Sequence, residues 1–325
     1  MFHRGCGGAG STAHPNPAPV GLRIPTAWIS AAVFLCAASF AAGDVAPTML
    51  LLDGVRAGTE IIAVGERGTI LRSTDNAGSW RPAENPGKAP LTAISLAPNG
   101  SRGWAVGHDA VILVTEDAGR SWALQWQGET LEDSFLDVLA LDDTRVIAVG
   151  AYGMVLHSSD AGKSWNRRRI DGDDFHLNRI SRGPTGTLYV AGERGTLLRS
   201  RDAGTTWAPI RSSYDGSFFG ILPLDRQTLV AYGLRGHVYR SADDGDTWVQ
   251  VEIPHPVLLA TAIRLKNGDI LIAGHARALL VSRDLGRTFA PVPTAMMTAI
   301  AELLELPDGG VLALGEAGAT VLSHP

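Results

Sequence analysis

Cysteine is almost absent from this sequence, and its distribution excludes two kinds of chemistry. The only two cysteines, Cys6 and Cys36, lie within the first 43 residues. The rest of the chain can form no disulfide and carries no thiol nucleophile. The nine histidines are scattered, and no two have the spacing of metal ligands, so we expect no metal site and no cofactor.

An excess of basic charge is also missing. Lysine and arginine total 28 against 33 acidic residues, and charged residues make up 19% of the chain. A nucleic-acid-binding protein has a basic surface, so we exclude nucleic acid as a partner. The 38 glycines have no Gly-X-Y period, which excludes collagen. Their regular spacing among short apolar runs is typical of tight turns between strands.

Only one apolar run is long, and it lies near the N-terminus. Residues 27–42 form an apolar stretch of about 16 residues, which is short for a membrane-spanning helix. Two arginines and no acid precede it, and the small residues Ala41–Gly43 end it. This order is that of a secretory signal peptide. We therefore expect residues 1–43 to be removed and residues 44–325 to form one exported domain, periplasmic or extracellular. An uncleaved membrane anchor is the alternative.

A repeat of about 41 residues occupies the rest of the chain. Its first signature is an apolar pair, then Gly-x-x-Gly, then an apolar run, as in AVGERGTILRS from Ala63 and VAGERGTLLRS from Val190. Seven copies at near-constant spacing indicate a repeat architecture. The leading glycines are Gly65, Gly107, Gly150, Gly192, Gly233, Gly274 and Gly315.

A second signature, the Asp box, follows six of the seven copies. It has the form Ser/Thr-x-Asp-x-Gly-x-Ser/Thr-aromatic, and the first copy, Ser73–Trp80, has its glycine one place late. Because apolar runs flank the box, we expect it to join two antiparallel strands, with the carboxylate accepting bonds from nearby backbone N–H groups. The aromatic ring would then pack between neighbouring sheets. Six equivalent acids do not make an active site, so we assign them a structural role. The carboxylates are Asp75, Asp117, Asp160, Asp202, Asp243 and Asp284, and the aromatic residues are Trp80, Trp122, Trp165, Trp207, Trp248 and Phe289.

Each repeat contains four segments of strand length. In the second repeat they are Leu91–Ala97, Gly103–Val106, Val111–Thr115 and Trp122–Trp126. Four antiparallel strands in 40–45 residues are typical of a propeller blade, so the sequence predicts an all-β, seven-bladed β-propeller. An open solenoid is less compatible, because solenoids with β-strands usually have shorter repeats and need dedicated caps.

The seventh repeat is one strand short. Its apolar segments are Thr298–Leu306, Val311–Leu314 and Thr320–Ser323, and the chain ends before a fourth. We expect Asp44–Pro47 to supply that outer strand and so to close the ring.

Three arginines occupy one equivalent place in the repeat. Arg67, Arg194 and Arg235 follow the leading glycine by two residues in blades one, four and five. Alternating strand directions put this turn on the face opposite the Asp boxes. Arginines on one face suit carboxylate-bearing or acidic protein partners. The alternative is that they are solvated turn residues.

These motifs resemble the photosystem II stability/assembly factors of plants and cyanobacteria, a family that also occurs in non-photosynthetic bacteria. The resemblance rests on seven repeats with the Gly-x-x-Gly run and the Ser-x-Asp-x-Gly-x-Thr-Trp box, and it covers residues 44–325. It implies a non-enzymatic helper on the lumenal or periplasmic side of a membrane. It also implies that this helper binds a membrane-protein complex or its assembly intermediates through arginines on one face. Arg67, Arg194 and Arg235 match those arginines by turn position.

Two other functions are compatible with Asp boxes. One is a sialidase-like glycoside hydrolase, for which Arg23-Ile24-Pro25 matches a motif but precedes the apolar run. Such enzymes have six blades and need carboxyl groups at a fixed separation. Asp133, Asp173 and Asp174 are acids that we expect to be exposed, but they suggest no defined pair. The other function is a carbohydrate- or ligand-binding propeller that uses its central channel.

Overall fold

The computed structural model describes residues 48–128, 130, 133–170, 174–254, 256–294, 296 and 298–322. The chain divides into residues 1–41 and a second unit, residues 42–325, and only the second contains described residues. The expected signal peptide therefore lies outside the described part of the chain, and its removal stays a prediction. In the described ranges, no helix combines the length and the apolar character needed to cross a membrane.

The described residues form seven antiparallel sheets, one for each repeat. Blades one to three contain β1 (Leu51–Ala57), β2 (Glu60–Gly65), β3 (Ile70–Ser73), β4 (Arg81–Pro82), β5 (Leu91–Leu96), β6 (Gly103–Gly107), β7 (Val111–Thr115), β8 (Ala123–Gln127), β9 (Phe135–Ala140), β10 (Val146–Gly150), β11 (Met154–Ser158) and β12 (Asn166–Arg169). Blades four and five contain β13 (Leu177–Arg182), β14 (Leu188–Gly192), β15 (Leu197–Ser200), β16 (Ala208–Pro209), β17 (Phe218–Pro223), β18 (Leu229–Gly233), β19 (Val238–Ser241) and β20 (Val249–Val251). Blades six and seven contain β21 (Leu259–Arg264), β22 (Ile270–Gly274), β23 (Leu279–Ser282), β24 (Ala290–Pro291), β25 (Ile300–Glu305), β26 (Val311–Gly315) and β27 (Gly318–Leu322). Short 3-10 turns follow β2, β10 and β18, namely η1 (Glu66–Gly68), η2 (Ala151–Gly153) and η3 (Leu234–Gly236).

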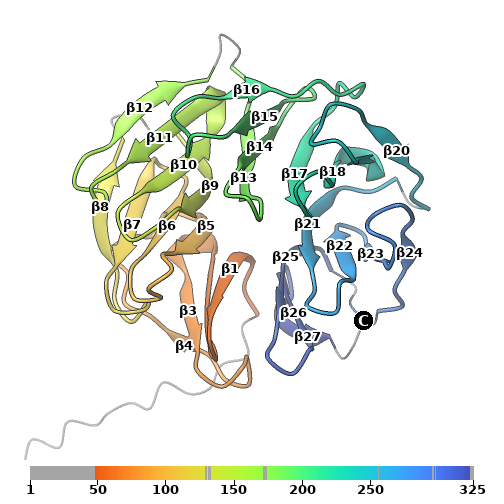
Figure 1. Cartoon of the computed structure of the whole chain (residues 1–325). Coiled ribbons are helices and arrows are strands. Elements are labelled where there is room, and N and C mark those ends of the chain that lie inside the picture. Colours follow the sequence, from red (N-terminus) through yellow and green to blue (C-terminus); the bar gives the residue numbers. More distant parts are fainter. Residues whose placement is uncertain are drawn as a thin grey trace, which may run out of the picture. The chain divides into compact units, whose positions relative to one another are not determined.

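Every blade runs outward in chain order. Its first strand lies at the centre of the ring, and each later strand pairs with the one before it (Figure 1). Six sheets have four strands, and the seventh has three among the described residues. The predicted all-β, seven-bladed propeller is confirmed.

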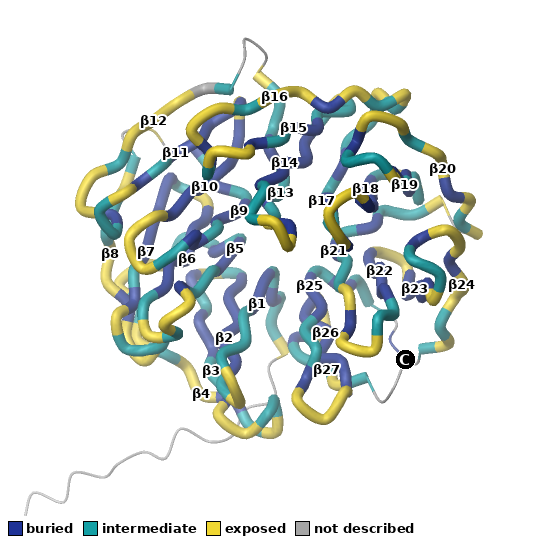
Figure 2. The backbone as a smooth tube through the Cα atoms, in the orientation of Figure 1, coloured by how far each residue is buried: buried dark blue, intermediate teal, exposed yellow. Residues whose placement is uncertain are grey.

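Burial follows the position of each strand within its blade. The second strand is buried along almost its whole length in every blade, for example Val146–Gly150 and Val311–Gly315. These strands are continuous apolar runs because a neighbouring blade covers each of their two faces. The outermost strands are mostly exposed, as the yellow rim of the ring shows (Figure 2).

The hydrophobic core lies between blades. Each of the seven core clusters draws its residues from two adjacent blades. Between blades two and three, for example, Trp104 packs with Phe135 and Met154, and all three are less than 2% exposed. Burying one such side chain contributes about 1.5–3 kcal/mol.

The ring is closed by packing between the first and last blades. Leu51 and Trp80 of blade one share a buried cluster with Leu312 and Leu314 of blade seven. Among the described residues, β27 has no strand on its outer side. Asp44–Pro47 lies outside the described residues, so its part in closure stays a prediction.

Candidate functional site

The six Asp boxes share one hydrogen-bond pattern. In blade four, Asp202 accepts bonds from the Ser200 hydroxyl at 2.8 Å, the Thr206 backbone N–H at 2.9 Å and the Thr206 hydroxyl at 2.6 Å. The other five carboxylates accept the same three bonds. The Thr206 hydroxyl and then its backbone N–H lower the pKa of Asp202 to about 2. The carboxylate thus closes its own loop.

The box aromatic rings lie against the cores between blades. Trp80, Trp122 and Phe289 are buried members of these clusters. Trp165, Trp207 and Trp248 are partly buried and pack against the edges of theirs. The ring therefore links the box hairpin to a neighbouring blade in all six cases.

The predicted arginines share one backbone conformation. We call the side of the propeller that carries the turns between second and third strands the turn face, and the opposite side the box face. Arg67, Arg194 and Arg235 lie on the turn face in left-handed backbone conformation, with φ of 56°, 50° and 57°. All three are exposed, and no ion pair joins any of them to another residue in the described ranges. Because their backbone angles agree, the three side chains leave equivalent blades in similar directions.

Tyr152 occupies the same turn position in blade three. Its φ is 56° and its side chain is 46% exposed. Its ring meets that of His176 edge-on, with centroids 5.2 Å apart. A large exposed aromatic residue among arginines is typical of a protein-binding surface.

Three glutamates of the turn face are already engaged. Three glutamates that directly follow a leading glycine each accept the backbone N–H of a residue just before the first strand of their own blade. These bonds run from Leu50 to Glu66, from His176 to Glu193 and from Ala299 to Glu316. The glutamates therefore anchor the crossovers between blades, and the arginines beside them keep their charge available.

One expectation about exposed acids is wrong. Asp133 is only 8% exposed and forms a two-pronged ion pair with Arg167, with N–O distances of 2.8 and 2.9 Å. Arg168 donates to the backbone oxygen of Thr205 in blade four at 3.0 Å. The basic run on β12 thus holds the crossover that leads into blade three and the box loop of blade four. Asp174 is exposed, and Asp173 lies outside the described residues.

A buried charge cluster lies in the central channel. Asp53, Asp137, Arg179 and Glu302 are each the third residue of a first strand, in blades one, three, four and seven. In each of these strands a β-bulge lies between the first and the third residue. It breaks the regular alternation of side chains there. All four line one small hollow of about 120 Å³.

The channel carboxylates join adjacent blades. Asp53 accepts the backbone N–H of Ile94 in blade two, and Asp137 accepts that of Ile180 in blade four, both at 2.8 Å. Glu302 accepts a bond from Thr261 of blade six at 2.9 Å and pairs with Arg179 across the channel. These bonds cross the blade boundaries and give the cluster a role in holding the ring.

Burial dominates the protonation of this cluster. It raises the pKa of Asp137 to about 6, although Arg179 and two backbone N–H groups oppose it. Burial, and then the charge of Glu302, raise the pKa of Asp53 well above its usual range. Carboxyl groups with shifted pKa values often mark active sites. In these groups, however, a carboxylate oxygen accepts a hydrogen bond from a neighbouring blade.

The channel cluster was not predicted from the sequence, although the repeat contains a signal for it. The third residue of each first strand lies within an apolar segment, and it is charged in four of the seven repeats. Aligned by repeat, the residues are Asp53, Ala93, Asp137, Arg179, Gly220, Thr261 and Glu302.

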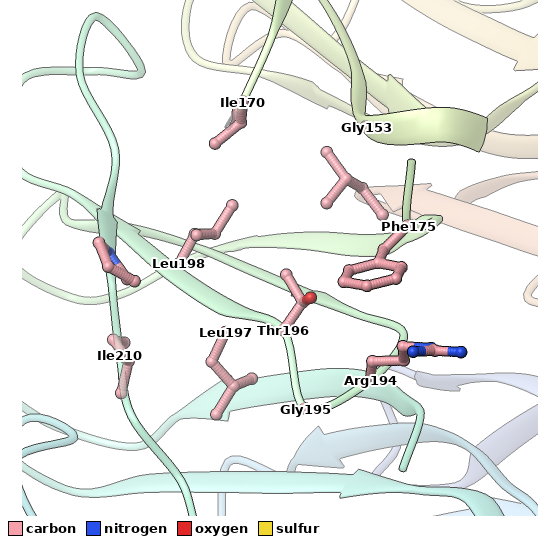
Figure 3. Close-up of a pocket in the computed structure, with 11 residues that line it drawn as sticks. Gly153, Ile170, Phe175, Arg194, Gly195, Thr196, Leu197, Leu198 and Ile210 are labelled. Atoms are coloured by element: carbon pink, nitrogen blue, oxygen red, sulfur yellow. The ribbon is translucent and has the colours of Figure 1, made fainter. Parts of the chain in front are cut away.

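A hollow with several apolar side chains in its walls lies beside Arg194, between the outer parts of blades three and four. It has a volume of about 280 Å³, and its lining includes Phe175, Leu198 and Ile210 (Figure 3). The guanidinium carbon of Arg194 lies 5.3 Å from the centre of the Phe175 ring. A cation over an aromatic face is held there by the ring quadrupole. Arg194 therefore combines a fixed charge with an adjacent apolar surface.

Taken together, these features define a seven-bladed propeller of the Asp-box type with an arginine-bearing turn face. Within that class, residues 123–257 match the sequence model of the family described as photosynthesis system II assembly factor YCF48. The resemblance to photosystem II assembly factors is thereby confirmed.

Solved structures show the same fold. One described as YCF48 bound to D1 peptide has a TM-score of 0.70 at 20% identity, covering 86% of this chain and 94% of that chain. YCF48 from Cyanidioschyzon merolae has a TM-score of 0.71 at 16% identity, covering 86% and 97%. The WD40 propeller domain of Doa1 has a TM-score of 0.68 at 14% identity, covering 85% and 94%. No curated protein sequence matches the chain.

Proposed function

We propose that this chain is an exported, non-catalytic propeller that binds protein partners through its turn face and assists the assembly or stability of a membrane-associated complex. The observation that carries the proposal is the set of exposed arginines at one turn position, Arg67, Arg194 and Arg235. The family match supports the class of function. The YCF48 structure described as bound to a D1 peptide supports binding to a peptide segment of a partner protein.

The chemistry of the turn face favours carboxylates. Guanidinium groups stay charged at all relevant pH values and pair with carboxylates in a two-pronged geometry. Because the nearby glutamates are engaged by backbone N–H groups, an incoming acid does not have to displace an internal partner. Aromatic Tyr152 adds apolar contact area on the same face.

The test is a pull-down from crosslinked membranes of the native host. We expect Arg67→Ala, Arg194→Ala and Arg235→Ala combined to reduce capture of membrane-associated partners at least tenfold. The matched control changes three exposed arginines of the box face, Arg120, Arg226 and Arg283, to alanine. Both variants should melt with the parent, because exposed ion pairs contribute little. Undiminished capture by the first variant would remove the arginines from the binding surface.

The proposal includes export. The order of charged, apolar and small residues in the first 43 positions supports it. Mass spectrometry of the protein from its native host should find a mature N-terminus within a few residues of Asp44. Retention of Met1 on a cytoplasmic protein would contradict this part of the proposal.

The two alternatives receive less support. The Arg-Ile-Pro motif of the sialidase alternative lies outside the described residues, at positions 23–25. The channel hollow of about 120 Å³ is smaller than the roughly 300–1,000 Å³ of typical small-molecule pockets. A carbohydrate has little room there.

A further inference from the structure

The hollow beside Arg194 has walls from blades three and four, with Gly153 and Ile170 on the side of blade three. β15 supplies Leu197 and Leu198, the end of β16 and the residue after it supply Pro209 and Ile210, and the crossover from blade three supplies Phe175. β16 is only two residues long, and its pairing with β15 ends with a bond from the Ile210 backbone N–H to the Leu197 oxygen at 2.8 Å. Both residues of this last bond line the hollow.

Neighbouring blades fill the equivalent place with their own side chains. The residue after the turn in blade four is Thr196, whose side chain lies among the lining residues (Figure 3). In blade three this position is Met154, which is 1% exposed and packs in the core between blades two and three. In blade five it is His237, and the Tyr214 ring lies against it with centroids 4.6 Å apart. Blade four has a small residue where these blades have a large one.

The charge beside the hollow indicates what fills it. Arg194 is exposed, lies over Phe175 and has no ion-pair partner in the described ranges. An apolar side chain would gain burial in the hollow, and a carboxylate close to it in the same segment would meet the guanidinium group.

We propose that the hollow of blade four binds one large apolar side chain of an extended partner segment, with Arg194 pairing with a carboxylate one or two residues away. This rests on the proposed function, since it places part of the partner on the turn face. It adds an apolar anchor that the arginines alone do not provide.

Substitutions of Thr196 separate the hollow from the arginine. Thr196→Met fills the hollow with the side chain that blade three already has at this position. Thr196→Val keeps the size of the side chain and leaves the hollow open. Thr196 donates its backbone N–H to the Glu193 oxygen at 2.9 Å, a bond that both variants keep.

Blade six offers the matched control. Ala278 is the equivalent of Thr196, and the hollow beside it, about 540 Å³, is lined by Leu280 and Val292. Its arginine, Arg277, lies one place later in the turn, and no aromatic ring of the described chain lies under it. Ala278→Met therefore places the same new side chain where the Arg194 arrangement is missing.

The probe is a random dodecapeptide library selected on the purified full chain. We expect enriched peptides to carry a large apolar residue within two positions of an acid or of the C-terminal carboxylate. Fluorescence anisotropy with a synthetic enriched peptide should then show binding at least tenfold weaker for Thr196→Met. Thr196→Val and Ala278→Met should stay within twofold of the parent. Because Ala278 is only 5% exposed, binding is compared at a temperature at which the melting curve of each variant shows it to be folded.

The outcomes distinguish this inference from the proposed function. Enriched peptides without an apolar residue would overturn the inference. So would unchanged binding by Thr196→Met, or an equal loss in Ala278→Met. If the triple arginine variant loses binding while Thr196→Met keeps it, the arginine face stands and the hollow is not its anchor. If Thr196→Met loses binding while the triple arginine variant keeps it, the arginines and the carboxylate pairing are both refuted.

Discussion

At the scale of single residues, the pKa of an aspartate side chain shifts in opposite directions at the rim and in the channel. Asp202 at the rim of the ring accepts three hydrogen bonds that favour its charged form, and its pKa falls to about 2. Asp137 in the channel loses its solvent, and burial raises its pKa to about 6. Position in the blade, rather than residue type, decides whether the carboxylate stabilises the fold as an anion.

The two pKa shifts predict a maximum of stability in moderately acidic solution. Depressed groups such as Asp202 stabilise the fold above about pH 4, and this contribution is lost as the pH falls through 2. A raised group such as Asp137 favours the fold while it is protonated, and that contribution is lost as the pH rises from about 4 through 6. We expect the melting temperature to peak near pH 4 and to decline toward pH 7.

The Asp137→Asn variant tests the upper limb of that curve. Asparagine stays neutral, so the decline between pH 4 and 6 should become shallower, whatever the variant loses in absolute stability. The group faces Asp53, Arg179 and Glu302 across the channel, so a residual slope from Asp53 is expected. A curve with the same slope as the parent would show that Asp137 does not titrate in this range.

The Asp boxes and the charged cluster of the channel also differ in how far they can be predicted from the sequence. An Asp box closes within four residues of its carboxylate, so its chemistry is visible in a single repeat. Arg179 and Glu302 are 123 residues apart and meet only because the ring brings blades four and seven together across the channel. No local pattern encodes that meeting.

At the scale of strands and hairpins, the repeat predicts almost the whole architecture. The second blade was expected at Leu91–Ala97, Gly103–Val106, Val111–Thr115 and Trp122–Trp126. The observed strands differ from these by one residue at four of the eight ends, and β8 begins at Ala123 because Trp122 belongs to the box turn. The two-residue length of the outer strands β4, β16 and β24 was not foreseen, because the length of an outer strand depends on what its neighbours pack against it.

The box tryptophans should contribute unequally to stability. Trp122 is 6% exposed within the core between blades one and two, so Trp122→Ala is expected to cost about 3–5 kcal/mol. Trp207 only borders its core, so Trp207→Ala should cost less. Urea unfolding of the two variants measures the difference. Equal losses would mean that the box ring stabilises its own hairpin rather than the contact between blades.

At the scale of the whole molecule, the ring is held by seven similar interfaces and by bonds across the channel. Blades one and seven meet through a buried apolar cluster, so closure does not depend on a strand exchange alone. The outer edge of β27 is nevertheless unpaired among the described residues, and unpaired edges promote association with other chains.

Removing Asp44–Pro47 from the exported chain tests the remaining part of closure. If these residues supply the fourth strand of blade seven, the deletion should lower the melting temperature and increase aggregation. A deletion variant that melts with the parent would mean that the cluster around Leu314 and Trp80 is sufficient.

The central claim is that partners bind the turn face. The most direct measurement is crosslinking in the native host from a photoreactive phenylalanine analogue placed at Tyr152, where the natural side chain is already aromatic and exposed. The same analogue at Lys163, an exposed residue of the box face, is the matched control. We predict a defined crosslink to a membrane-associated protein from Tyr152 and none from Lys163. Crosslinks from Lys163 alone would place the partner on the opposite face and contradict the claim.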